Sequence, residues 1–213
     1  MSTALVAVTV KSPFGTRDRV KAAVAEQRAV RLAFASDVRW ATAELSRREA
    51  AAVRGQRRAA LAELRAAGQL LDSVDRLAVA GTRHEMRERR WNIDWPPVPA
   101  EALDIGRWPG SRDGGYPESI PLRLPLDLAE QVRAACWHTS ADAIGRLRDW
   151  RDRYPDAIPG RDVGPTDALA EYERLAQQVT TVGVVYRAGL ELGIAQALQK
   201  TDCKLEKSRS ENF

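Results

Sequence analysis

Residues 182–198 read VGVVYRAGLELGIAQAL, and they belong to the most regular pattern in the chain. From Leu169 to Leu198, apolar side chains recur at every third or fourth position, which is the spacing of one face of an α-helix. The pattern predicts a helix that begins near Thr166. Its glycines lower helix propensity, so we expect another element to approach the backbone closely at Gly183, Gly189 and Gly193. A strand over 179–186, where β-branched residues cluster, is the alternative.

A second helical pattern lies upstream, in the first half of the chain. Apolar residues recur at helical spacing in two runs, 20–45 and 61–77. Between these runs the pattern thins to alanine and arginine, and Ser46 followed by Glu49 matches a capping box that begins a new helix. One bent helix and a helical hairpin or coiled-coil arm both fit this pattern. Gly81 is the residue expected just beyond its C-terminal end.

The composition changes between Trp91 and Pro125, where seven prolines and four glycines exclude helix through most of the segment. Large aromatic side chains in the same segment favour an ordered strap that covers the helices over a disordered linker; they are Trp91, Trp95, Trp108 and Tyr116. Short extended stretches are expected at 3–10 and 119–125. Two helices, 126–137 and 141–154, should follow the strap.

These patterns predict a mainly α protein with a long N-terminal helical arm or hairpin, a central strap rich in proline, glycine and tryptophan, and a C-terminal helical bundle with at most one or two short strands. The expected segments are an extended piece at 1–15, a basic helical arm at 16–90, the strap at 91–125, a C-terminal helical region at 126–200 and a disordered tail at 201–213.

Charge is distributed unevenly along the chain. The formal net charge is only +4, but residues 1–90 hold 18 basic and 10 acidic side chains, and the remainder holds 15 and 19. This asymmetry predicts an anionic partner for the first half, or a homo-oligomer in which the basic half of one copy meets the acidic half of another. The sequence contains no uncharged apolar stretch long enough to predict a membrane span. Two cysteines cannot form a disulfide framework. We therefore expect a cytoplasmic protein.

A basic run ends in an aromatic residue at 83–91, RHEMRERRW. Arginines bind a phosphate backbone, and a neighbouring indole ring can stack on a base. A solvated helix end, with arginines near the negative end of the helix dipole, is the alternative. The candidate DNA contacts in the whole chain are Arg54, Arg57, Arg58, Arg87, Arg89, Arg90, Trp91 and Arg123.

We expect no cofactor, no metal site and no catalytic residue, because the chain has no phosphate loop, no nucleophile elbow and no metal-ligand spacing. One enzyme class stays open. A metal-dependent nuclease could be built on the carboxylates of the strap, which are Asp94, Asp104, Asp113 and Glu118.

Residues 120–135, IPLRLPLDLAEQVRAA, resemble the opening of a ribbon-helix-helix DNA-binding domain, and the resemblance extends over 119–154. It implies that the strand pairs with its twin in a dimer. It also implies that Arg123 faces outward as a DNA contact, opposite Leu122 and Leu124. The sequence departs from that family at the expected turn between the two helices, which lacks the usual glycine.

Taken whole, the helices rich in arginine and alanine, the strap and the helical C-terminal region resemble accessory proteins of actinobacterial plasmids and integrative elements. The resemblance implies a non-enzymatic, DNA-associated accessory or regulatory protein involved in plasmid maintenance, transfer or spread. It carries over no functional residue. The alternative is a helical homo-oligomeric interaction scaffold that binds no nucleic acid, because the long apolar pattern also suits self-association.

Overall fold

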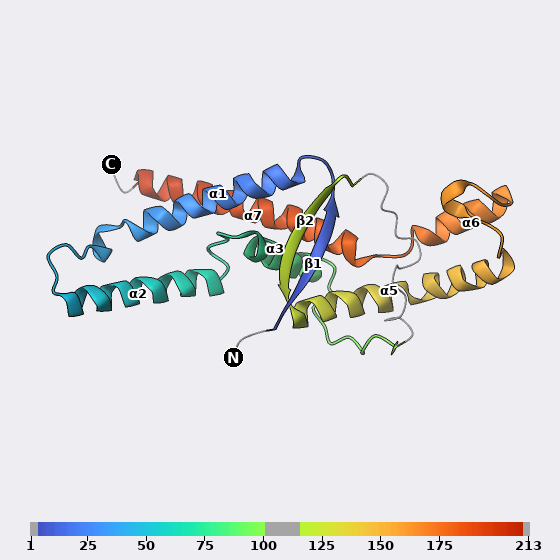
Figure 1. The fold of residues 1–213 in the computed structure, drawn as a ribbon, viewed down its shortest axis with the longest axis horizontal. Helices are drawn as coiled ribbons and strands as arrows, with labels where there is room; N and C mark the ends of the chain where they lie inside the picture. Colours follow the sequence, from blue (N-terminus) through green and yellow to red (C-terminus); the bar gives the residue numbers. More distant parts are fainter. Residues whose placement is uncertain (1–3, 101–115, 211–213) are drawn as a thin grey trace.

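The computed structural model describes residues 4–100 and 116–210, with side chains described as far as residue 199. Within that part the protein is mainly helical, as expected, with one antiparallel sheet of two strands. In order, the elements are β1 (Leu5–Ser12), α1 (Thr16–Ala35), the 3-10 helix η1 (Val38–Trp40), α2 (Arg47–Ala66), α3 (Val74–Glu88), β2 (Glu118–Pro125), α5 (Leu126–Arg153), the 3-10 helix η2 (Pro159–Arg161), α6 (Thr166–Ala176) and α7 (Val182–Ser210). Figure 1 shows an elongated molecule with the sheet across its middle, α1 and α2 projecting at one end, and α5 and α6 at the other.

The centre of the fold is the crossing of α3 and α7. Gly81 of α3 lies directly against Gly189 of α7, so a Cβ atom at Gly81 would overlap the Gly189 carbonyl oxygen. A Cβ at Gly189 would lie 2.9 Å from the backbone nitrogen of Thr82, and one at Gly193 would lie 2.8 Å from the Leu77 side chain. The two backbones are therefore in contact. The expected close approach is confirmed at Gly189 and Gly193 but is wrong at Gly183, where the atoms nearest an added Cβ belong to the side chains of Arg187 and Thr181.

Gly81 itself corrects a prediction. We expected it just beyond the end of a helix, but it lies inside α3, which continues to Glu88. A glycine in a helix interior costs about 1 kcal/mol relative to alanine. Here the missing side chain is what allows α7 to approach.

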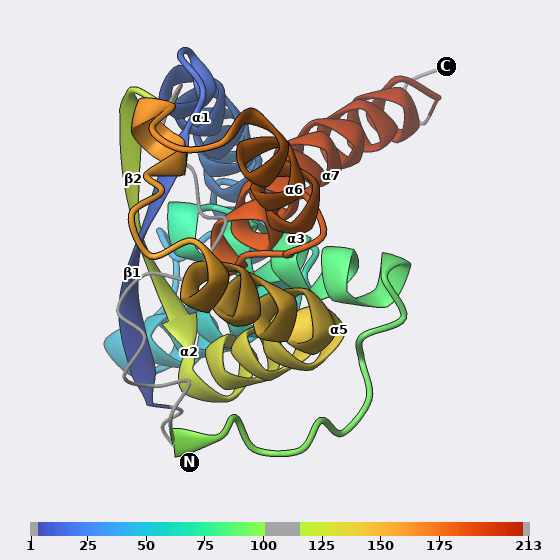
Figure 2. The ribbon, with the colours of Figure 1, turned by 90° about the vertical axis from the view of Figure 1, so that its right-hand side faces the viewer.

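The two strands form a ribbon that covers one side of the helices. The register pairs Val6 with Leu124 and Val10 with Ile120 on the inner face. The residues at the alternate positions, such as Arg123, are exposed, which gives the alternating burial of a sheet with one solvated face. Figure 2 shows the strands along one side of the molecule with the helices gathered on the other. Both expected extended stretches are thus confirmed as strands.

The pairing of the strands contradicts the dimer implied by the ribbon-helix-helix resemblance. β2 pairs with β1 of the same chain. The helix that follows also differs, because α5 runs unbroken over 126–153, where two helices were expected. No glycine or proline lies at the expected break, 138–140, and the hydroxyls that could have capped a second helix are used elsewhere. Thr139 donates to the Ala135 carbonyl, and Ser140 Oγ accepts from the Thr180 amide at 2.9 Å.

The last helical pattern is divided where one helix was expected. α6 ends at Ala176, and α7 begins at Val182. The strand alternative over 179–186 is also wrong. The connecting residues are held by tertiary contacts, since Val179 is buried against α5 and Thr180 bonds to Ser140.

The expected disordered tail is wrong for residues 201–210, which continue α7. This part of the sequence holds lysine and glutamate, which favour helix, and no glycine or proline to end it. Residues 211–213 lie outside the described part of the chain.

The hydrophobic core extends across the expected boundaries between arm, strap and bundle. One hydrophobic cluster takes side chains from six elements, including Val10, Val24, Leu77, Leu122, Val132 and Leu190. The segment 16–90 is therefore no separate arm, because α1 and α3 pack with α7. Only the end of α1, η1 and α2 project, and α2 begins at the expected capping box of Ser46 and Glu49.

The strap divides into parts with different structures. Trp91 and Trp95 pack against the central core, as an ordered strap requires. The end of the expected strap is β2, and residues 101–115 lie outside the described part. A second core joins α5 to α6 around Trp150, whose indole nitrogen donates to the Ala168 carbonyl at 2.7 Å.

Substitution of Gly81 by alanine should lower the free energy of unfolding by about 3 kcal/mol, because the new methyl group overlaps backbone atoms that cannot move independently. Gly55→Ala in α2 is the matched control, since no atom lies within 4 Å of its added Cβ. It should raise stability by about 1 kcal/mol through helix propensity alone. Urea unfolding of both variants measures the difference, and equal effects would contradict backbone contact at the crossing.

Candidate nucleic-acid interface

Arginines form a line along one side of α2. Their spacing of seven, four and seven residues places them within an arc of about 40° on a helix; they are Arg47, Arg54, Arg58 and Arg65. By the same count, Glu49 and Glu63 lie on the opposite side. We call the exposed members Arg47, Arg54 and Arg58 the arginine face of α2. In the described part of the chain, no carboxylate lies within 4 Å of these three guanidinium groups.

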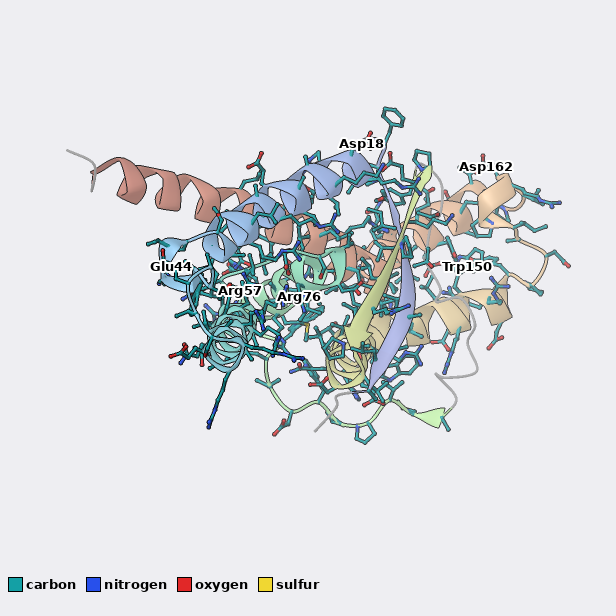
Figure 3. The ribbon with its side chains drawn as sticks, turned by 60° about the vertical axis from the view of Figure 1, so that its left-hand side comes forward. Asp18, Glu44, Arg57, Arg76, Trp150 and Asp162 are labelled. Carbon is teal, nitrogen blue, oxygen red and sulfur yellow. The ribbon has the colours of Figure 1, made fainter. Side chains whose placement is uncertain are left out.

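A second line of arginines follows one side of α3, at Arg76, Arg83 and Arg87. It meets the end of the first line at a groove of about 700 Å³. We call this the arginine groove. Its charged lining consists of Arg65, Arg76, Arg83, Arg87, Arg123 and Asp75. Figure 3 shows Arg57 on α2 and Arg76 on α3, the helices that contribute most of these arginines.

Asp72 organises the inner side of the groove. Its side chain is only 2% exposed and accepts hydrogen bonds from Arg65 at 2.6 Å and from Arg76 at 3.1 Å, with Arg31 at 3.6 Å. Burial opposes ionisation of Asp72, but the hydrogen bond and charge of Arg65, with the charges of Arg76 and Arg31, outweigh it. The pKa of Asp72 is consequently held below its usual range. One carboxylate thus fixes three arginines and leaves a positive excess.

The position of Asp72 follows from how α2 ends. Gly68 adopts φ 64°, the left-handed conformation that terminates many helices. The chain then buries Leu71, whose amide donates to the side-chain oxygen of Gln27 at 3.0 Å. Gln27 also donates to the Ala197 carbonyl at 2.7 Å, so one buried amide joins α1 and α7 to this segment. Asp72 is held directly after this anchor.

The outer side of the groove carries three further arginines. Among the described residues, no carboxylate lies within 4 Å of the guanidinium groups of Arg83, Arg87 or Arg123. All three side chains are exposed. Asp75 is nearby, but its carboxylate accepts the backbone amide of Arg123 at 2.9 Å and so holds β2 against α3.

The sequence-predicted DNA contacts fall into two groups. Four of them are exposed arginines on the arginine face or in the groove, namely Arg54, Arg58, Arg87 and Arg123. Arg90 is also exposed, at the end of α3 with φ 58°, but it does not line the groove. The remaining three have contacts within the protein.

Arg57 donates to the Ala35 carbonyl at 3.2 Å and thereby caps the end of α1. Arg89 donates to Glu85 at 2.6 Å, and its guanidinium lies 5.0 Å from the centre of the Trp91 ring. Trp91 is half-buried against the core. These contacts use part of what each side chain could offer to DNA, so we expect weaker DNA contacts from these three than from the exposed arginines.

Sequence reasoning did not single out Arg47, Arg65, Arg76 and Arg83, which complete the two lines. The signal was present, because arginine recurs at intervals of four and seven within both helical patterns. Arg123 joins them through strand pairing, which no local spacing reveals.

The carboxylates of the nuclease alternative do not converge in the described part. Glu118 accepts the amides of Gly15 at 2.9 Å and Arg17 at 2.7 Å, and so caps the start of α1. Asp94 lines a separate pocket beside α5. Asp104 and Asp113 lie outside the described residues.

The side chains that could bind a metal or act as a nucleophile form no site in the described part of the chain. The described residues hold no cluster of three or more side chains of the metal-ligating types. Burial raises the pKa of the Cys136 thiol to about 12, which leaves it protonated at neutral pH. The His138 ring stacks on Trp95. In the same part of the chain, no helix is long and apolar enough to cross a bilayer.

Comparisons of the chain with protein-family models, with curated proteins and with solved structures find no match. The two arginine lines and the groove between them are therefore the features that indicate function.

Substitution of Asp72 by asparagine should lower the free energy of unfolding at pH 7 by about 2 kcal/mol, the typical contribution of hydrogen bonds to a charged group. The folded-state pKa of Asp72 is lowered, so its stabilising effect is present above the unfolded value of about 3.9 and is lost as pH falls through the folded value. Urea unfolding at a series of pH values should show the wild-type and Asp72→Asn curves converging at acidic pH. A gap independent of pH would contradict the role of the carboxylate.

Proposed function

We propose that this chain binds the phosphate backbone of duplex DNA, as a non-enzymatic accessory or regulatory protein. The observation that carries the proposal is the arginine face of α2, where three exposed guanidinium groups lie in line on a projecting helix with no carboxylate within 4 Å in the described part of the chain. Unpaired arginines release counterions from DNA, because their charge is not already neutralised within the protein.

The shape of this face favours backbone contact over base recognition. The line from Arg47 to Arg65 extends about 27 Å along α2, at 1.5 Å for each residue. Charges along one side of a helix can follow the phosphates of one strand, whereas sequence recognition needs side chains directed at base edges. We therefore expect binding that depends strongly on salt and weakly on sequence, with Arg87, Arg90 and Arg123 adding contacts beyond the end of α2.

The biological setting is proposed from the resemblance of the chain to accessory proteins of actinobacterial plasmids and integrative elements. A sequence-tolerant DNA-binding surface suits a protein that acts in the maintenance, transfer or spread of such an element. The proposal includes no catalytic step.

The double variant Arg54→Ala/Arg58→Ala tests the role of the arginine face. Each phosphate contact contributes about 0.9 to the slope of log K against log salt concentration, so loss of two contacts should reduce that slope by about 2. Fluorescence anisotropy with a labelled duplex of arbitrary sequence, measured at several salt concentrations, gives both affinity and slope.

Arg151→Ala/Arg174→Ala is the matched control, because it removes the same charge from exposed positions on α5 and α6, at the other end of the molecule. It should leave the slope unchanged. Absence of binding at low salt, or equal losses in both double variants, would overturn the proposal.

A helical homo-oligomeric scaffold is the second candidate, and the weak packing of α2 favours it. Of the twenty described residues of α2, only Ala50 is buried. Nearby apolar side chains are also solvent-exposed, with Leu32 at 61% and Val38 at 86%. Exposed apolar groups on a projecting hairpin suit contact with a second copy of the chain.

Sedimentation equilibrium tests the scaffold. A dimer should form at a concentration on the order of 50 μM, and Leu32→Glu should dissociate it by placing a charge in the contact. A monomer throughout this range would exclude the scaffold as proposed.

A further inference from the structure

The arginine groove combines arginines with an apolar part of its lining, which we call its floor, and a DNA backbone alone would use only the arginines. We propose that it is a nucleotide site, in which a phosphate contacts the arginines and a nucleobase covers the floor. The inference goes beyond sequence-tolerant backbone binding, and it rests on the proposed function only where the nucleotide belongs to a DNA strand.

The phosphate side is formed by Arg83, Arg87 and Arg123. Arg83 and Arg87 are one helical turn apart on α3, and side chains at this spacing are neighbours on the helix surface. Arg123 joins them from β2. The planar guanidinium fork donates two parallel hydrogen bonds to phosphate oxygens, and a terminal phosphate offers enough oxygens for more than one arginine.

The positive charge of the groove is fixed before any ligand arrives. Asp72 holds Arg65 and Arg76, while the Asp75 carboxylate holds the backbone of Arg123. The five lining arginines exceed these two carboxylates by three charges. A dianionic phosphate would therefore reduce the repulsion between cations that the fold already places together.

The floor of the groove indicates more than a phosphate. Its apolar lining includes Leu5, Val79, Ala80 and Pro125, together with Ala66 and Ala67. Leu5 is 61% exposed, which leaves much of its side chain available to a ligand. Bare phosphate would leave this surface in water, whereas the flat face of a nucleobase would bury it. The volume of about 700 Å³ falls within the range of small-molecule sites.

One ligand chemistry has two sources here, a free nucleotide and the phosphorylated end of a DNA strand. The end of a strand would place its next phosphates toward Arg65, the residue at which the groove meets α2. Deoxyadenosine monophosphate represents the first source. A short single strand with a 5′-phosphate represents the second, with the same strand ending in a 5′-hydroxyl as its control.

Isothermal titration calorimetry with the full chain tests the site. Deoxyadenosine monophosphate should bind more tightly than either deoxyadenosine or inorganic phosphate, because each of these lacks half of the ligand. A strand with a 5′-phosphate should bind more tightly than its 5′-hydroxyl control and be displaced by the free nucleotide. If the nucleotide binds and competes but the 5′-phosphate adds nothing, the source is the free nucleotide.

Variants assign the binding to the groove. Arg83→Gln/Arg87→Gln should weaken nucleotide binding at least about tenfold, the effect of losing one charged hydrogen bond or more. Arg151→Gln/Arg174→Gln, which removes the same charge from exposed positions outside the groove, should change it less than about twofold on the same reasoning. Leu5→Ser should weaken binding of the nucleotide but not of phosphate. Circular dichroism of each variant verifies folding.

The outcomes separate this inference from the proposed function. If duplex DNA binds through α2 but deoxyadenosine monophosphate does not bind at millimolar concentration, the nucleotide site is wrong and the DNA proposal stands. If the nucleotide binds and duplex DNA does not, the reverse holds. Binding that survives Arg83→Gln/Arg87→Gln unchanged would also overturn the nucleotide site.

Discussion

The contact between the backbones of α3 and α7 is the constraint on which the rest of the structure depends. Without side chains at Gly81 and Gly189, the two helices meet closely enough for one core to include both halves of the chain. The contact also determines which side of α3 faces the core and which side faces solvent. Its glycine side turns inward, and by helical geometry Arg76, Arg83 and Arg87 lie well over 90° away from it, toward solvent.

Charge in this protein is organised by position more than by amount. A net charge of +4 would suggest little, yet half of the basic side chains of the first half lie on α2 and α3, and several of these line the groove where the two helices meet. Asp72 is central to this arrangement. Its pairing with Arg65, Arg76 and Arg31 keeps like charges close together. Other arginines of the groove face outward with no carboxylate within 4 Å among the described residues.

Features encoded by neighbouring residues could be predicted from the sequence. The capping box of Ser46 and Glu49 and the glycines of α7 are examples, because spacing alone defines them. Predictions failed where contacts between residues distant in the sequence determine where a helix begins or ends. The bond from Thr180 to Ser140 helps separate α6 from α7 while α5 continues unbroken, although the local sequence suggests the reverse. Prediction of the groove would require both kinds of information. The spacing of the arginines is visible in the sequence, whereas the position of Arg123 depends on strand pairing.

The pairing of β1 with β2 has a consequence for how the chain reaches its native state during synthesis. β1 leaves the ribosome early but has no partner until residues 118–125 follow, and the α3 glycine contact waits still longer for α7. Folds that depend on such distant contacts form slowly, and their apolar surfaces stay exposed in the meantime. Arginine and alanine dominate the helices that are synthesised first. Both residues favour helix while adding little exposed apolar surface to the nascent chain, which limits aggregation during this delay.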